Sequence, residues 1–141
     1  MPDTQTFLSV AETLARRAGD LCLEIQQDLG EIHYKSKKDV VTRADIASEK
    51  LIVEGIRKAF PTHSIRTEEA GVIEGTDPRY LWIIDPVDGT VNFSRGIPLW
   101  GISIALHFEG KPLVAAVNLP KLGELYTASL GGGAFMNGQA I

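Results

Sequence analysis

Apolar residues near the start of the chain recur at steps of three and four positions. They are Phe7, Val10, Leu14, Ala18, Leu21, Cys22, Ile25 and Leu29. This spacing places them on one face of an α-helix, because a helix completes a turn about every 3.6 residues. We therefore predict a long amphipathic helix that ends near Gly30.

A second helical pattern follows the polar stretch 35–39. Thr42 and Asp45 have the spacing of a helix N-cap and the acidic residue that supports it. Apolar residues then continue at helical spacing until Pro61, which cannot extend a helix: Leu51, Ile52, Ile56, Ala59 and Phe60. The second helix is predicted to start with Thr42 as its N-cap and to end before Pro61.

The pattern changes to short strands in the rest of the chain. Apolar runs or alternating apolar and polar positions predict strands at 64–66, 80–84, 102–108, 113–118, 125–129 and 134–136. The segments 109–112 and 137–138 carry hairpin turn signals. Two helices followed by strands joined by tight turns indicate an α+β fold, with both helices packed on one face of a largely antiparallel sheet.

Composition narrows the class of protein. A chain of 141 residues can bury a core without disulfides, and its single cysteine, Cys22, cannot form an internal bridge. No secretion signal or membrane-spanning apolar run stands out, so we expect a cytoplasmic protein with no membrane partner. The formal charge of −4 provides no basic surplus for nucleic acid, so we expect no nucleic-acid partner. A phosphorylated ligand would need a metal to offset nearby carboxylates.

The strongest candidate for chemistry is the segment Asp85-Pro86-Val87-Asp88-Gly89-Thr90. Both carboxylates and the Val87 carbonyl can point to one place, and such hard oxygen ligands suit Mg²⁺. The small residues that follow can present backbone N–H groups to a phosphate. The alternative is that Asp-Pro and Asp-Gly are ordinary turn formers.

A second acidic feature is the adjacent pair Glu68-Glu69. Adjacent like charges repel unless water or a cation compensates them, so the pair is either solvated or part of a metal site. By contrast, His33, His63 and His107 share no metal-ligand spacing, and structural roles are expected for them.

Taken together, these motifs resemble the inositol monophosphatase family. The match consists of Val41-Thr42-Arg43-Ala44-Asp45, the Glu68-Glu69 pair and the 85–90 segment, in this order. It extends through Val91-Asn92-Phe93 to the segment 133–138. The resemblance covers about 11–141 and implies the N-terminal half of the layered αβαβα sugar-phosphatase fold.

The resemblance also implies metal ligands. Glu68, Asp85 and the Val87 carbonyl would bind a first Mg²⁺, and Asp85 with Asp88 would contribute to a second. The family uses two or three such sites, and this chain would hold one nearly complete. Sensitivity to lithium is expected on the same grounds.

Catalytic roles follow from the same resemblance. The Gly89 and Thr90 amides would receive phosphate oxygens, while Glu68 and Thr90 would orient a metal-activated water. Asp45 would bond to Thr90, although it is equally well explained as a helix-capping acid. Residues 35–38 would form a loop near the site, or simply a solvated lysine cluster.

The activity implied is Mg²⁺-dependent hydrolysis of a small phosphate monoester, such as inositol-1-phosphate or a related polyol or sugar phosphate. Fructose bisphosphate, histidinol phosphate and nucleotide 3′-phosphate are alternative substrates. A different possibility is a catalytically impaired chain that acts as a metal-binding or interaction module.

Family members are about twice this length. We therefore expect residues 1–141 to correspond to the N-terminal metal-binding domain, without the C-terminal domain. That domain carries a further metal-binding aspartate in a Trp-Asp pair, whereas neither Trp82 nor Trp100 is followed by Asp. The chain alone is expected to bind Mg²⁺ weakly, to hydrolyse phosphate esters slowly or not at all, and to form homo-oligomers through its uncovered apolar surface.

Overall fold

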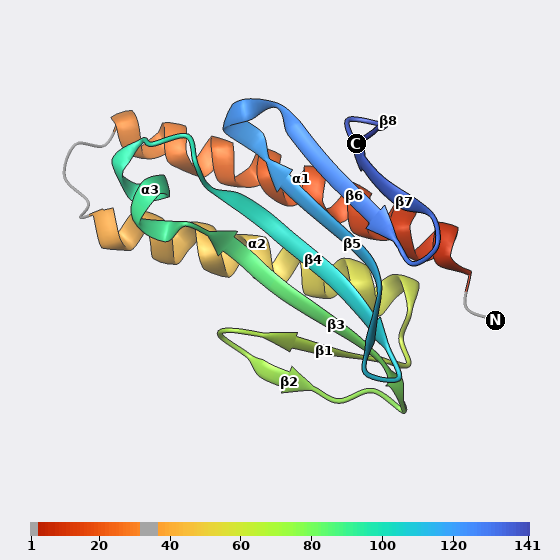
Figure 1. The fold of residues 1–141 in the computed structure, drawn as a ribbon. Helices are drawn as coiled ribbons and strands as arrows, with labels where there is room; N and C mark the ends of the chain where they lie inside the picture. Colours follow the sequence, from red (N-terminus) through yellow and green to blue (C-terminus); the bar gives the residue numbers. More distant parts are fainter. Residues whose placement is uncertain (1–2, 32–36) are drawn as a thin grey trace.

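The computed structural model describes the backbone of residues 3–31 and 37–141, with side chains for 3–27 and 43–141. Two long helices, α1 (Thr4–Glu31) and α2 (Lys37–Ala59), lie side by side against one face of an eight-stranded sheet (Figure 1). This confirms the α+β fold with two helices on a sheet. None of the helices in the described residues is long and apolar enough to cross a membrane.

The sheet has the strand order β2-β1-β3-β4-β5-β6-β7-β8. Its strands are β1 (His63–Thr67), β2 (Gly71–Ile73), β3 (Asp77–Asp88), β4 (Gly101–Phe108), β5 (Lys111–Leu119), β6 (Glu124–Ser129), β7 (Gly133–Met136) and β8 (Gln139–Ala140). A short helix, α3 (Thr90–Arg95), joins β3 to β4, and a 3₁₀ turn (Pro120–Leu122) joins β5 to β6. Strands β1 and β3 are parallel, whereas the other recorded pairs are antiparallel, as predicted.

The two predicted hairpin turns have the backbone conformation that their sequences favour. Glu109 and Gly110 have φ angles of 50° and 81°, and Asn137 and Gly138 have φ angles of 51° and 81°. Two successive positive φ values are typical of tight hairpin turns that match the twist of the strands. The turn residues therefore fix the register of β4 with β5 and of β7 with β8.

The core lies between the helices and the sheet. Alternate strand residues face the helices and are buried: Trp82, Ile84, Ile102, Ile104, Leu106, Val114 and Ala116. Helix α1 contributes small side chains, including Ala11, Ala15 and Ala18, which allow it to approach the strands closely. The intervening strand residues face the other way, and in the described part of the chain both long helices lie on the same side.

The largest differences from the predicted boundaries are at the start of α2 and the end of β3. Helix α2 begins at Lys37, so Thr42 lies inside the helix and the prediction that it is the N-cap is wrong. Residues 37–42 contain neither Gly nor Pro, so nothing in that stretch ends the helix. Residues 37–38 are thus helical, and the remainder of the predicted loop 35–38 lies outside the described residues. Strand β3 also continues beyond the predicted end at residue 84, as far as Asp88.

An aromatic cluster at one end of the sheet surrounds His63. Its ring stacks on Phe60 and Tyr80, with centroid separations of 4.9 and 4.2 Å. Its Nδ1 accepts a hydrogen bond of 3.0 Å from the indole N–H of Trp82, so this nitrogen carries no proton. Burial lowers the pKa of His63 below its ordinary value, although Asp77 acts in the opposite direction. These contacts agree with the structural role expected for His63.

Acidification is expected to destabilise the fold through His63. The unfolded chain takes up a proton on this residue near pH 6.5, whereas the folded chain does so only at lower pH. This contribution is therefore complete above about pH 6.5 and decreases as the pH falls below it, by at most about 1.4 kcal/mol per pH unit. Urea unfolding of wild type and His63→Phe between pH 7.5 and 5 measures the difference. Parallel stability profiles of the two proteins would contradict this role.

Candidate functional site

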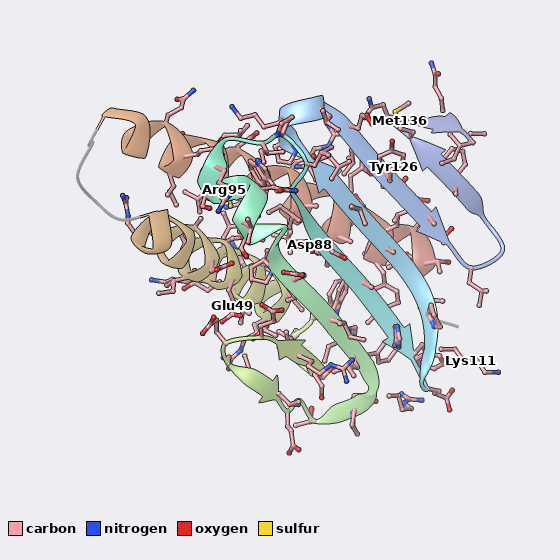
Figure 2. All side chains as sticks on the ribbon, turned by 60° about the vertical axis from the view of Figure 1, so that its left-hand side comes forward. Glu49, Asp88, Arg95, Lys111, Tyr126 and Met136 are labelled. Carbon is pink, nitrogen blue, oxygen red and sulfur yellow. The ribbon has the colours of Figure 1, made fainter. Side chains whose placement is uncertain are left out.

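The predicted acidic residues of the site come from three segments that meet where β1 and β3 end. Asp85 and Asp88 lie at the end of β3, Glu68 lies in the turn between β1 and β2, and Asp45 lies on α2. Figure 2 shows Asp88 at the end of its strand and Glu49 on α2 beside the β1–β2 turn. The structure thus brings segments that are far apart in sequence to one region.

A β-bulge sets the directions of the two aspartates on β3. Asp85 pairs with Ser103 and Asp88 pairs with Gly101, so two residues of β3 lie opposite the single residue Ile102. In a regular strand, residues three apart point to opposite faces of the sheet. The extra residue in the bulge turns Asp85 and Asp88 to the same face. This is the feature that allows both carboxylates to contribute to one site.

The bulge is followed by a sharp change of direction at Gly89. This residue has φ 87° and ψ 46°, and it begins α3 without a side-chain cap. A Cβ at Gly89 would lie 2.9 Å from the Leu99 carbonyl oxygen, so both the backbone angle and the lack of space require glycine. The first amides of α3, starting with Thr90, are therefore not capped by the residue that precedes the helix.

The short helix α3 is fixed from the helical layer. Gln26 of α1 donates a hydrogen bond of 2.9 Å from Nε2 to the Phe93 carbonyl. Phe93 is buried, and its ring meets Trp100 edge to face at a centroid separation of 4.8 Å. Gly89 and Thr90 thus occupy a defined position between the acidic residues and the core.

Two carboxylates of the site, those of Asp85 and Asp45, have a raised pKa, chiefly because they are partly buried. Burial raises the pKa of Asp85 to about 6, and the charges of Glu68 and Asp88 add to this effect, while the Val87 amide opposes it. Because these charges act on Asp85, the three acids share one electrostatic environment. Removal of one charge or addition of a cation would relieve the repulsion.

Asp45 belongs to the same environment. Burial raises its pKa to about 6, with further contributions from Glu68, Glu69, Asp85 and Glu49. The Oδ1 atoms of Asp45 and Asp85 are buried and have no hydrogen-bond partner. The proposed bond between Asp45 and Thr90 is not among the hydrogen bonds of the described side chains, so this role remains a prediction.

Glu49 was not among the predicted site residues. It lies one helical turn after Asp45 and accepts a hydrogen bond of 3.4 Å from the Glu69 amide. Its position four residues after Asp45 places both acids on the same side of α2. This spacing is the sequence signal that points to Glu49 as a neighbour of the site. Without the fold, however, a helical glutamate that approaches a site cannot be distinguished from one that only faces solvent.

The chemistry of these groups fits a hard divalent cation, although their spacing is not yet that of a ligand set. Among the described side chains, those of residues 3–27 and 43–141, no three His, Cys, Asp or Glu groups are arranged closely enough to hold a metal ion. The unpartnered oxygens of Asp45 and Asp85 are nevertheless suitable donors for Mg²⁺. The recorded ion pairs of the described residues, Arg16–Glu12 and Arg79–Asp77, leave the site acids uncompensated. Binding would therefore require the carboxylates to move closer together.

A hollow of about 400 Å³ lies beside Glu68 and Asp85 on the sheet face opposite α1 and α2. Ile83 and Ala105 form part of its lining, together with Arg66. A second hollow of about 250 Å³ borders Asp88 and Gly89. The acidic region is thus open to a small ligand from this face.

Comparisons with known proteins identify relatives of this chain. Residues 3–141 match the inositol monophosphatase family. The chain is 44% identical over 137 residues to the Nus factor SuhB of Escherichia coli K12. The matched region covers 96% of this chain and 51% of that protein. The chain therefore spans about half the length of the curated relatives it matches.

Solved structures of related proteins have the same fold and a clearly similar sequence. The extragenic suppressor protein SuhB from Bartonella henselae superposes with a TM-score of 0.86 and 34% identity, over 96% of this chain and 52% of that one. An inositol monophosphatase from Anabaena gives a TM-score of 0.82 and 38% identity, over 99% and 50%. The expected correspondence to the N-terminal half of such proteins is confirmed, and the chain belongs to the inositol monophosphatase family.

Proposed function

We propose that this chain supplies the metal- and phosphate-binding part of a Mg²⁺-dependent phosphomonoesterase. The observation that carries the proposal is the bulge that turns Asp85 and Asp88 to one face, where Glu68 adds a third carboxylate. Acids with unpartnered buried oxygens and no recorded cationic partner are the groups that a hard cation stabilises. A purely structural turn would not require this concentration of charge.

The proposed ligands are Glu68, Asp85, Asp88 and the Val87 carbonyl. Mg²⁺, when bound, supplies Lewis-acid activation of water and neutralises charge on the phosphate. Val87 is buried, so its backbone position is fixed by packing against the core. The two aspartates are held by the same strand and differ in depth, since Asp85 is half-buried and Asp88 is exposed.

The other proposed roles belong to residues around the Gly89 turn. The Gly89 and Thr90 amides bind phosphate oxygens, because N–H groups at the start of a helix favour anions. Glu68 and the Thr90 hydroxyl orient the attacking water, and Glu68 accepts its proton. Asp45 supports Thr90 from α2. Catalysis then depends on alignment and charge compensation, as is usual for phosphoryl transfer.

The proposed substrates are small polyol or sugar phosphates, with inositol-1-phosphate as the first choice. The solved Anabaena relative is named an inositol monophosphatase, which supports this class. Fructose bisphosphate, histidinol phosphate and nucleotide 3′-phosphate remain alternatives. The relatives extend over about twice the matched length, and we propose that their other half completes the substrate pocket.

A second candidate function is that of an interaction module. The Escherichia coli relative is named a Nus factor, which is a description of assembly and not of phosphate chemistry. In that case the acidic site would be dispensable. Substitution Asp88→Asn separates the two functions, because it removes a proposed ligand that is exposed and contributes little to packing.

Phosphate release from inositol-1-phosphate tests the proposal. The 141-residue chain is expected to hydrolyse the substrate only with Mg²⁺ and far more slowly than a full-length family member. EDTA and Asp88→Asn should each abolish the activity, whereas Lys111→Gln, at the far end of the sheet, should not. Turnover that persists in EDTA and in Asp88→Asn would refute the proposed chemistry, and turnover equal to that of a full-length relative would refute the expected impairment.

A further inference from the structure

The bulge of β3 is held from behind by a side chain of α2. Ser48 is completely buried, and its hydroxyl donates a hydrogen bond of 2.8 Å to the Pro86 carbonyl. Pro86 lies between Asp85 and the proposed Val87 ligand, at the point where the ladder between β3 and β4 is interrupted. Backbone groups at a bulge lose regular partners, so a side-chain donor at this point fixes the local conformation.

The position of Ser48 on α2 gives this bond a wider effect. Asp45 precedes Ser48 by three residues and Glu49 follows it directly, so all three belong to the part of the helix that approaches the site. The Ser48 bond therefore fixes the separation between the acids of α2 and those of β3. Apolar packing between the helix and the bulge is not directional, so it would fix their separation less closely without this bond.

Two of the groups around Ser48 are buried and uncharged at neutral pH. The thiol of Cys22 on α1 lies beside it, and burial raises the pKa of Cys22 to about 12. The thiol is therefore protonated at neutral pH and places no negative charge next to the site. Ile52, one turn further along α2, is also completely buried and closes the space on that side.

We propose that Ser48 is a positioning residue that sets the affinity of the acidic site for a divalent cation. It touches neither metal nor substrate. It acts by holding the Pro86 carbonyl, and through it the aspartates on both sides of the bulge, against the acids of α2. This inference rests on the proposed metal site and adds a residue to it that lies behind the ligands.

Ser48→Ala tests the inference, with Ile52→Val as the matched control. Both substitutions remove buried atoms from the same face of α2, but only the first removes the bond to Pro86. Titration with Mn²⁺, followed by electron paramagnetic resonance, is expected to show affinity about tenfold weaker for Ser48→Ala, because supporting hydrogen bonds around metal ligands have effects of this order. The affinity of Ile52→Val should equal that of wild type. Equal affinities for wild type and Ser48→Ala, or an equal loss in both variants, would overturn the proposal.

A second measurement uses the metal-free chain. Hydrogen exchange of the Val87 and Gly89 amides is expected to be faster in Ser48→Ala than in Ile52→Val, after allowance for their global stabilities. If wild type takes up no Mn²⁺, the proposed function fails, but this exchange still decides whether Ser48 positions the bulge. Unchanged local exchange would then refute the positioning role.

Should Ser48→Ala fail to fold, Ser48→Cys under reducing conditions replaces it. The thiol has the shape of the hydroxyl, although it is larger, and it is a weaker donor. Mn²⁺ affinity between those of wild type and a ligand variant such as Asp88→Asn is expected. Affinity equal to that of wild type would count against a requirement for the hydrogen bond.

Discussion

Replacing Asp85 with Asn is expected to stabilise the metal-free chain and to abolish its response to Mg²⁺. Burial and the charges of Glu68 and Asp88 raise the pKa of Asp85 to about 6, so at neutral pH the charge of Asp85 costs more free energy in the folded chain than in the unfolded chain. Asn removes the charge but retains an oxygen that can accept a hydrogen bond from the Val87 amide. Because Asp85 is half-exposed and solvent screens the repulsion, we expect a gain of about 1 kcal/mol in the free energy of unfolding.

Thermal unfolding in EDTA and in Mg²⁺ measures both effects of Asp85→Asn. Wild type should be stabilised by Mg²⁺, since a ligand that binds only the folded state raises its stability, and the variant should not. Asp77→Asn is the matched control at the other end of β3, where Asp77 forms an ion pair of 2.9 Å with Arg79. It should give no stabilisation and retain the Mg²⁺ response. If Asp85→Asn loses as much stability as Asp77→Asn, the carboxylates of Asp85, Glu68 and Asp88 do not repel one another appreciably.

Gly89→Ala is expected to have the largest effect on folding among the substitutions at the site. Two costs combine, because φ is 87° and the new Cβ would lie 2.9 Å from the Leu99 carbonyl oxygen. A left-handed conformation costs a non-glycine residue about 1–2 kcal/mol, and the contact with backbone adds to it. We expect a loss of about 3 kcal/mol in the free energy of unfolding, together with loss of phosphate binding.

Gly96→Ala separates these two costs. Gly96 ends α3 with φ 74°, but a Cβ there would meet nothing within 4 Å. It should therefore show only the conformational cost, of about 1–2 kcal/mol. Urea unfolding of both variants measures the difference. Equal losses would mean that the approach of Leu99 to Gly89 does not restrict the turn.

The long elements could be predicted because their patterns are local. The helical spacing from Phe7 to Leu29 and the alternation over 102–108 each follow from one repeating period, and both elements were found. The start of α2 was predicted wrongly because a capping pair such as Thr42 and Asp45 can also occur inside a helix. Strands β2 and β8, with three and two residues, are too short to leave a periodic signal.

The site was only partly predictable for a different reason. The acidic residues and Gly89 could be identified from their types and order, but the face to which Asp88 points depends on the register between β3 and β4. Neither this bulge nor the bond from Ser48 to Pro86 has a local sequence signature, since each depends on a partner from another element. The spacing of Glu49 from Asp45 is visible in the sequence, but its contact with the Glu69 amide also depends on another element.

Calorimetric titration of the 141-residue chain with Mg²⁺ tests the central claim most directly. Saturable uptake is expected, with weak affinity because half of the relatives' length is not matched. The uptake should be absent in Asp85→Asn and preserved in Asp77→Asn. No binding by the wild-type chain, or identical binding by the two variants, would contradict the assignment of Glu68, Asp85 and Asp88 to a metal site.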